Sequence, residues 1–501
     1  MRGGTARVFT GYLDEYGMNI NLDPVAQDNS AVLHASGPGA ASHEYNFLYV
    51  LGVAVVASAG GFLFGYDLAL IAGALPFLTR EFGLSAAMSG WTAGSAPIGA
   101  IIGPLLGLWF ADAIGRRRTM MAAAMLFLGS TIGCAAADSI AQFTIWRVIG
   151  GMGVGLAMIS CPIYIAELSP PHLRGTLVNV NQLVGVIGIN LAVLAGYLVS
   201  QYGGGWRLMF ASQGLPVAFL IVGLLMVPES PRWLAAKGCT ERALAVLKRI
   251  NGIDRAKQEL EEILRDVHAS SPAGAAEVFK AYCRKPLQVS IIMMIFSQIN
   301  GVNMILLYGP TILNDAGVSF GANSILSSLP TYMTIFVATL ISFPLINRYS
   351  RRGLLIASVL GMAFSHLLMA TLLAVHAPAL SVLIPMMLGA GTFTVGLAPL
   401  SWIIVSEIFP NRVRSPALAV VCVFLFGSSS LTVQLFPMAM DWLRQTTGTP
   451  ALMYVVFAAI CASCAVFTWK VMPETKGVSL EAIGEFWRSR AAGGARKLPE
   501  G

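Results

Sequence analysis

Apolar residues occur in runs of about 20 along most of the chain, and short polar stretches separate them. A helix needs about 20 such residues to cross the hydrocarbon core of a bilayer, and it satisfies its own backbone hydrogen bonds there. The pattern therefore predicts an all-α membrane protein with twelve transmembrane helices. The predicted spans lie near residues 48–75, 90–111, 119–137, 142–166, 177–200, 207–227, 287–312, 325–347, 353–375, 381–407, 415–438 and 450–471.

The polar stretches divide the chain into two halves of six spans each, residues 47–227 and 287–472. Residues 1–46 lack the continuous apolar run of a signal peptide, so we expect a disordered N-terminal tail. Residues 228–286 form a linker in which we expect two short helices under the bundle. Residues 473–501 form a C-terminal tail.

The distribution of charge predicts the topology. The net charge is +7, but 28 of the 32 Lys and Arg residues fall in the two tails and in every second loop. Positively charged loops mark the cytoplasmic face of a membrane protein. We therefore expect a multi-pass protein of the plasma or inner membrane with both termini in the cytoplasm, and no nucleic-acid partner.

Several chemistries have no motif in the sequence. The seven Cys residues form no disulfide framework and no CxxC zinc site. No GxxxxGK[ST] loop is present, which argues against ATP-driven pumping. We expect no enzymatic activity, no metal and no other cofactor.

The two halves repeat each other. Four motifs recur at offsets of 235 to 245 residues. They are Gly65-Tyr66-Asp67 with Gly301-Val302-Asn303, Asp112-x-x-Gly115-Arg116-Arg117 with Asn347-x-x-Ser350-Arg351-Arg352, Glu167 and Arg174 with Glu407 and Arg414, and Pro228-Glu229-Ser230-Pro231 with Pro473-Glu474-Thr475. Parallel repeats of this kind are typical of secondary transporters, which bind their substrate near the membrane midplane between the halves.

Two charged residues, Asp67 and Arg147, lie well inside predicted spans. A charge at the bilayer centre costs about 2.5–3.5 kcal/mol on insertion scales, so such residues are kept when they are paired or functional. The repeat gives neutral counterparts, Asn303 for Asp67 and Met387 for Arg147. We interpret the two as an ion pair with Asp67 as a proton site; an ion pair with only a structural role is the alternative.

Six stretches resemble the sugar porter branch of the major facilitator superfamily. They are GGFLFGYD at Gly60, GLWFADAIGRRR at Gly107, PIYIAELSPPHLRG at Pro162, PESPRWL at Pro228, SWIIVSEIFPNRVR at Ser401 and PETKGVSLE at Pro473. The resemblance spans about residues 48–487. It implies a monosaccharide or polyol as substrate and proton symport, because facilitators of that family carry a neutral residue at the Asp67 position. We expect a monomeric functional unit.

Charged residues on the predicted cytoplasmic side form a candidate gate, in which carboxylates pair with guanidiniums across the two halves. The candidates are Asp112, Arg116, Arg117, Glu167, Arg174, Glu229 and Arg232, followed by Arg351, Arg352, Glu407 and Arg414. Asn347 and Ser350 replace the Asp and Gly usual in the family, so we expect a weaker second half of the gate. The resemblance also implies that Tyr308 is an extracellular gate residue.

The resemblance places a sugar site at Gln182, Gln298, Asn303 and Trp402, with Thr394 and Ser429 at two further family positions. Carboxamides donate and accept hydrogen bonds, and an aromatic ring covers a sugar's C–H face. Hydrogen bonding between helices is the alternative role. Ser297, Leu425 and Phe426 replace polar or aromatic family residues, so we expect a less polar pocket. Polyols therefore stay candidate substrates beside sugars.

Three other functions compete with symport. A facilitator of the same fold would use Asp67 and Arg147 for structure alone. A sugar sensor would bind without transport, but it usually needs a longer signalling tail. An antiporter of drugs or organic anions would export amphiphiles.

Overall fold

The computed structural model describes residues 46–170, 173–269, 275–315, 322–409, 411–476 and Trp487. These residues belong to one compact unit, Glu44–Gly501, and they form helices and connecting turns without a β-strand. The predicted N-terminal tail and most of the C-terminal tail lie outside the described residues.

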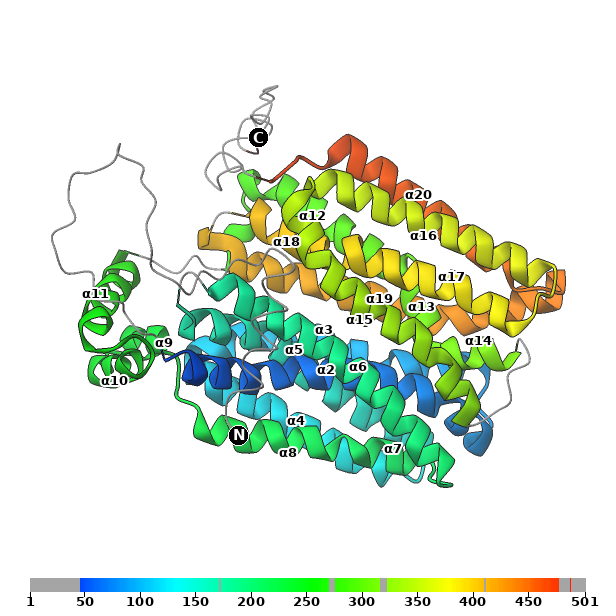
Figure 1. The fold of residues 1–501 in the computed structure, drawn as a ribbon, viewed down its shortest axis with the longest axis horizontal. Coiled ribbons are helices and arrows are strands. Elements are labelled where there is room, and N and C mark those ends of the chain that lie inside the picture. The colour runs from blue at the N-terminus through cyan, green and yellow to red at the C-terminus, as the bar shows by residue number, and fades with distance from the viewer. Residues whose placement is uncertain are drawn as a thin grey trace, which may run out of the picture. The chain divides into compact units, whose positions relative to one another are not determined.

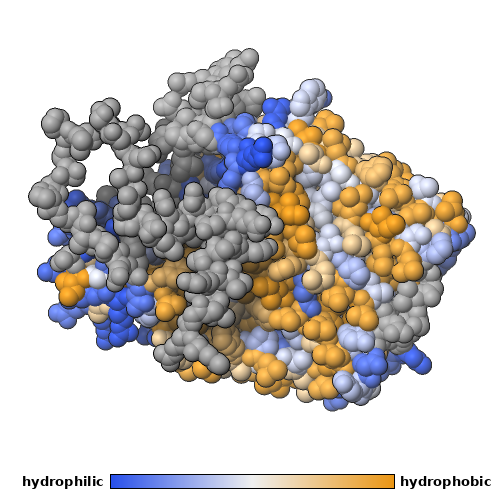
Figure 2. All heavy atoms as spheres, in the orientation of Figure 1, coloured by the Kyte–Doolittle hydropathy of each residue, from blue (hydrophilic) through white to orange (hydrophobic). Residues whose placement is uncertain are grey.

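Eleven helical segments in the described ranges are long and apolar enough to cross a membrane. A further helix, α3 (Ala86–Ile114), has 29 residues and matches the predicted span 90–111. All twelve predicted spans are therefore helical. The side of the molecule seen in Figure 2 carries a broad band of hydrophobic residues. Hydrophilic residues gather towards the ends of this band, as a protein that spans a bilayer requires.

Helices of the first half lie side by side in Figure 1, with those of the second half beside them. The first half comprises α2 (Phe47–Phe82), α3, α4 (Arg116–Ala135), α5 (Ile140–Leu168), α6 (Arg174–Gln201), α7 (Trp206–Ser212) and α8 (Gly214–Met226). The second half comprises α12 (Ala281–Ile299), α13 (Val302–Leu307), α14 (Gly309–Asp315), α15 (Ala322–Arg348), α16 (Arg351–Ala374), α17 (Ala379–Thr392), the π-helical η2 (Phe393–Leu397), α18 (Ala398–Ile408), α19 (Asn411–Thr447) and α20 (Ala451–Val471).

The span predicted at 287–312 is interrupted at Asn300 and Gly301, between α12 and α13. Gly301 has φ +89°, a left-handed conformation that favours glycine. A Cβ there would lie 2.5 Å from the Phe457 ring of α20. The break therefore depends on a residue without a side chain.

The two halves meet through α3 with α19 and through α6 with α15. Ser430 Oγ donates to the Gly94 carbonyl at 3.0 Å, and a Cβ on Gly90 would lie 2.3 Å from the Gln434 carbonyl oxygen. Asn190 Nδ2 of α6 donates to the Tyr332 carbonyl of α15 at 3.3 Å. Small residues thus allow close backbone approach between the halves.

The linker contains three α-helices where two were predicted: α9 (Pro231–Ala236), α10 (Thr240–Asn251) and α11 (Ile253–Ala269), followed by the 3₁₀ turn η1 (Ala275–Phe279). Ser230 starts α9 because its hydroxyl accepts the Trp233 N–H at 3.2 Å. The Asn46 N–H donates to the Ile250 carbonyl at 3.2 Å, which joins α10 to the start of α2. We call this end of the bundle the linker end and the opposite end the far end.

Candidate functional site

Asp67 lies midway along α2, and Arg147 Nη1 of α5 donates a hydrogen bond to its Oδ1. The Arg147 side chain is 3% exposed and the Asp67 side chain 13%. The predicted contact between the two charged residues is confirmed. Removing one partner of a buried pair leaves an uncompensated charge, at a cost of about 3–5 kcal/mol.

Packing around the pair is close on both sides. A Cβ on Gly65 of α2 would lie 2.0 Å from the Gly185 carbonyl oxygen of α6, so these two helices touch beside Asp67. The Arg147 guanidinium lies 5.7 Å from the Phe210 ring centroid of α7. Its Nε has no hydrogen-bond partner among the described residues. The Nε–H of the guanidinium is therefore available to another acceptor.

Two of the predicted sugar-binding residues are in direct contact across the break between α12 and α13. Asn303 Nδ2 donates to Gln298 Oε1 at 2.7 Å, and both side chains are half-buried. Asn303 is the repeat counterpart of Asp67. The second half therefore presents an amide pair where the first half presents a charged pair.

The other predicted sugar-binding residues are spread over three helices. Gln182 on α6 is exposed, whereas Trp402 on α18 and Ser429 on α19 are half-buried. Among the described side chains, no hydrogen bond joins these three to the amide pair. Gln182 is eight residues, about two turns, from Asn190, whose amide contacts Tyr332 in the other half. At 100° per residue, Gln182 points about 80° away from Asn190 around α6, so the exposed Gln182 lies beside the face of α6 that contacts the other half.

Thr394, a further predicted sugar-binding residue, uses its hydroxyl proton within the helix. It lies in η2, is 7% exposed, and donates its hydroxyl proton to the Ala390 carbonyl at 2.8 Å. Ser297 likewise donates to the Met294 carbonyl at 2.7 Å, and Leu425 and Phe426 are buried. These four side chains offer a ligand few hydrogen-bonding groups. This agrees with the expectation of a less polar pocket in the second half.

The carbonyl of Asn300, at the break after α12, is held by two residues that the sequence did not single out for this task. His366 Nε2 of α16 lies 2.7 Å from this oxygen, and Cys461 Sγ of α20 donates to it at 3.7 Å. His366 is fully buried beside Phe457, which agrees with a packing role. No local signal could identify these partners, because they lie 66 and 161 positions away.

Charged residues at the linker end form a network in the first half. Arg116 Nε lies 3.1 Å from Glu167 Oε2, and its Nη1 lies 3.1 Å from Asp112 Oδ1. Glu229 Oε1 accepts the Arg117 N–H at 3.0 Å, and Arg117 Nε donates to the Leu224 carbonyl at 2.6 Å. The network joins α3, α4, α5 and the segment after α8.

The second half repeats this network with one weaker contact. Glu474 accepts the Arg351 and Arg352 N–H groups at 3.0 and 3.1 Å, and Arg352 Nη2 donates to the Trp469 carbonyl. Arg351 Nη2 lies 3.8 Å from Glu407 Oε1, against 3.1 Å for the matching pair in the first half. The longer distance agrees with the weaker second half expected from the sequence.

Among the described residues, no ion pair joins candidate gate residues of the two halves. Each ion pair named above joins helices of one half. Arg174 is exposed at the start of α6, within the electrostatic reach of Glu259 of α11, and Arg414 is half-buried on α19. Arg232 pairs with Asp266 of α11 at 3.5 Å, so its described ion pair lies within the linker. Pairing across the halves stays a prediction for another state.

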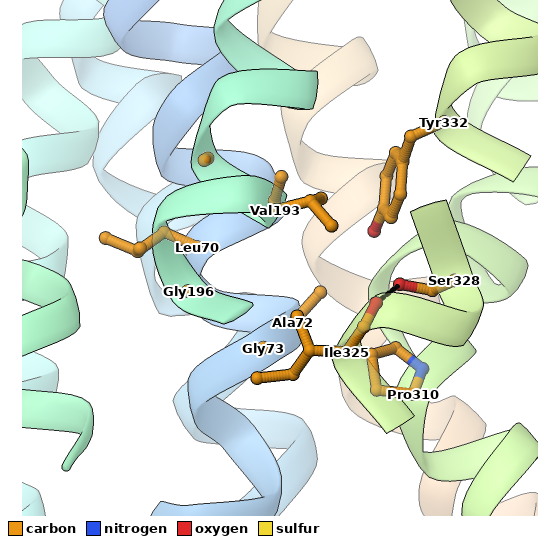
Figure 3. A pocket seen from close by; sticks show the side chains of 11 residues that line it. Leu70, Ala72, Gly73, Val193, Gly196, Pro310, Ile325, Ser328 and Tyr332 are labelled. Carbon is orange, nitrogen blue, oxygen red and sulfur yellow. Dashed lines mark hydrogen bonds between the residues drawn. The ribbon is translucent and has the colours of Figure 1, made fainter. Parts of the chain in front are cut away.

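The far end is closed. A pocket of only about 10 Å³, roughly the room for one water, remains between α2, α6, α14 and α15. Figure 3 shows Val193 and Tyr332 facing each other at this pocket, with Ile325 and Ser328 beside them. Tyr308, the predicted gate residue, is 4% exposed and donates its hydroxyl proton to the Val433 carbonyl of α19 at 3.0 Å.

Comparisons with known proteins give one consistent family. The model of the family described as "Sugar (and other) transporter" matches residues 53–487. The arabinose-proton symporter of Bacillus subtilis (strain 168) is 34% identical over 463 residues, covering 91% of this chain and 98% of the relative. The D-xylose-proton symporter of Escherichia coli (strain K12) is 33% identical over 481 residues, covering 89% and 97%.

Solved structures of a xylose transporter from E. coli share the fold. Its inward open conformation superimposes with a TM-score of 0.77 at 30% identity, covering 88% of this chain and 100% of that one. The complex of the proton:xylose symporter with 6-bromo-6-deoxy-D-glucose, described as a member of the major facilitator superfamily, gives 0.74 at 32% identity and the same coverage. On the match of family model, relatives and fold, the chain belongs to the sugar (and other) transporter family, within the major facilitator superfamily.

Proposed function

We propose that the protein imports a monosaccharide or polyol together with protons by alternating access. Asp67 is the proton site and Arg147 its partner. The observation that carries the proposal is the buried contact between these two side chains. It occurs in one half of a duplicated bundle whose other half has neutral residues, Asn303 and Met387, at the matching positions.

Protonation of Asp67 removes the negative charge that holds Arg147 on α5. An uncompensated buried guanidinium favours a different arrangement of α2 and α5. Proton binding and sugar binding then bias the same equilibrium between states open at the far end and at the linker end. Closure of the linker end brings Arg174, Arg414 and the carboxylates Glu167 and Glu407 into pairs across the halves.

The substrate contacts the exposed Gln182, the amide pair of Gln298 and Asn303, and the Trp402 ring. Two of the relatives carry arabinose and xylose, and a further relative, the major myo-inositol transporter of B. subtilis, is 32% identical. We propose a pentose or an inositol-type polyol, because the second half offers few hydrogen-bonding groups beyond the amides. The linker end faces the cytoplasm, since most Lys and Arg lie there.

Uptake by proteoliposomes tests the proposal. With an inward proton gradient, the wild type should concentrate one of arabinose, xylose or myo-inositol and acidify the lumen as the substrate enters. Asp67→Asn should exchange the substrate but not concentrate it. The matched control is Glu81→Gln, which removes a carboxylate that pairs with Arg207 at 2.7 Å near the far end and is 43% exposed; it should still concentrate the substrate.

Two results would reject parts of this proposal. Equilibration without accumulation by the wild type would make the protein a facilitator, with a structural ion pair. Binding without any flux, measured as substrate-dependent quenching of Trp402 fluorescence, would make it a sensor.

A further inference from the structure

A groove of about 580 Å³ lies between α15, α16 and the α17–η2 segment. Val337 and Ile341 line it and are 50% and 48% exposed. They lie about 140° and 180° around α15 from Tyr332, whose carbonyl faces α6. The groove therefore opens away from the other half, on the surface that faces lipid.

The groove offers an occupant no free hydroxyl proton. Its three hydroxyl residues all donate to backbone carbonyls: Thr334 to Pro330 at 2.8 Å, Ser358 to Thr392 at 2.7 Å, and Thr392 to Leu388 at 2.8 Å. The other lining residues are aliphatic, Met or Gly. A sugar or a water molecule would lose most of its hydrogen bonds there, whereas a hydrocarbon chain would lose none.

A cation lies at one end of the groove. Thr334, Ile341 and Arg348 are seven residues apart, so they share one face of α15. Arg348 is exposed at the linker end, about 10 Å beyond Ile341 and about 21 Å beyond Thr334 at 1.5 Å per residue. Half of a bilayer, headgroups included, is about 20–22 Å thick. With Arg348 among the headgroups, the groove therefore runs from about 10 Å deep to about the bilayer midplane. Lys476 adds a second cation, since its Nζ donates to the Arg348 carbonyl at 2.9 Å.

We propose that the groove binds one acyl chain of an anionic phospholipid from the leaflet at the linker end, with the lipid phosphate at Arg348. An arginine at the membrane surface attracts anionic headgroups by about 1 kcal/mol. The apolar groove, its length and the position of the cation together match one lipid molecule.

A bound chain also covers the wall that holds η2 in place. Ser358 Oγ accepts the Leu397 N–H at 3.0 Å and donates to the Thr392 carbonyl, so it bridges the π-helical turn. A Cβ on Gly396 would lie 2.3 Å from the Ser358 Cβ, which shows how closely the turn packs there. The lipid chain therefore supports the turn that leads into α18.

Photolabelling of the full-length protein in phosphatidylcholine nanodiscs tests the site. The probe is phosphatidylglycerol with a diazirine on its acyl chain, and labelled peptides are located by mass spectrometry. Labelling should concentrate on residues 334–341 and 387–395. Ala357→Trp places an indole in the groove and should remove most of that labelling. The control Val222→Trp adds the same ring on α8, at a lipid-facing position that is 57% exposed, and should leave it unchanged.

A second labelling experiment tests the headgroup assignment. Arg348→Gln should lower labelling by the phosphatidylglycerol probe about fivefold, the factor that corresponds to about 1 kcal/mol, and leave labelling by a phosphatidylcholine probe unchanged. Equal labelling around the whole bundle, or labelling of the groove that Ala357→Trp does not reduce, would overturn the site. Equal labelling by both probes, with no effect of Arg348→Gln, would overturn the anionic headgroup.

Discussion

The Glu229 carboxylate accepts the backbone N–H of Arg117 at 3.0 Å and so caps the N-terminus of α4. Glu474 does the same for α16 through the N–H groups of Arg351 and Arg352. In each half, the segment after the last helix is thus anchored to the start of the third span. A carboxylate at a helix N-terminus is stabilised by free N–H groups and by the helix dipole.

Replacing either carboxylate should weaken the half that it caps. Glu229→Ala and Glu474→Ala should each lower the unfolding free energy by about 1 kcal/mol, and the losses should add because the sites lie in different halves. Thermal unfolding in detergent measures this. Glu262→Ala, an exposed carboxylate of α11, should change stability by less than about 0.5 kcal/mol. Equal losses in all three variants would contradict a capping role.

The contact between α2 and α6 beside Asp67 should tolerate no added methyl group. A Cβ on Gly65 would lie 2.0 Å from the Gly185 carbonyl oxygen, so Gly65→Ala should push the helices apart and destabilise the fold by about 1–3 kcal/mol. Gly52 lies in the same helix with nothing within 4 Å of its Cβ position. Gly52→Ala should therefore leave stability unchanged or raise it, by up to about 1 kcal/mol. A similar melting temperature for both variants would show that the helices can move apart freely.

Most of the fold could be predicted from the sequence, because its signals are local. Each span is a run of apolar residues, and the duplicated motifs identify the halves. The Asp67–Arg147 contact was predictable for a simpler reason: each is a rare intramembrane charge whose compensation requires the other.

The break at Gly301 was not predictable, since it depends on Phe457 and His366 packing from distant helices. The hydroxyl of Thr394 donates within its own helix, a choice of rotamer that spacing does not specify. The gate pairs could not be placed because one sequence encodes several states, and this structure shows the state closed at the far end. In that state Arg116 and Arg351 find their carboxylates within their own halves.

The closed far end should be sensitive to bulk at Gly73. A Cβ there would lie 3.7 Å from Ile325, and the adjacent pocket has room for about one water. An indole cannot fit while the end is closed, so Gly73→Trp should hold the far end open and abolish net uptake. In intact cells, a cysteine at Ser328 should then react faster with an impermeant thiol reagent added outside. Val55→Trp, a 40% exposed position of α2, is the control and should transport normally.

The linker should respond to pH through Glu259. Burial raises the pKa of this carboxyl above its ordinary value, while the charges of Arg255 and Arg174 act in the opposite direction. The folded chain therefore keeps the proton at pH values where the unfolded chain has lost it. Stability consequently falls as the pH rises from about 4.3, the ordinary pKa of glutamate, to the raised value.

Glu259→Gln should remove that loss. Its melting temperature relative to the wild type should be similar below this window, should rise through it, and should stay higher above it. Differential scanning fluorimetry across this window measures the difference. A difference independent of pH would mean that Glu259 does not titrate in the linker.

Converting the charged pair to the residues of the second half separates stability from proton coupling. Asp67→Asn leaves Arg147 charged and 3% exposed without its carboxylate, at a cost of about 3–5 kcal/mol. Arg147→Met leaves a carboxyl that can take up a proton and become neutral, so its cost should be smaller. The double variant has the neutral pair Asn and Met, as at Asn303 and Met387. Replacing a buried pair with neutral groups is often without cost. We therefore expect the double variant to unfold at a temperature close to that of the wild type and above both single variants.

Transport by the same variants then tests whether accumulation of substrate depends on these two charges. A double variant that is folded, exchanges substrate and fails to concentrate it would assign the lost accumulation to the missing charges, because its stability is unchanged. A double variant that still concentrates substrate would move the proton site elsewhere, whatever the single variants do. A double variant less stable than Asp67→Asn would instead mean that the Arg147 side chain stabilises the fold without its carboxylate, through contacts such as the one with Phe210 at 5.7 Å.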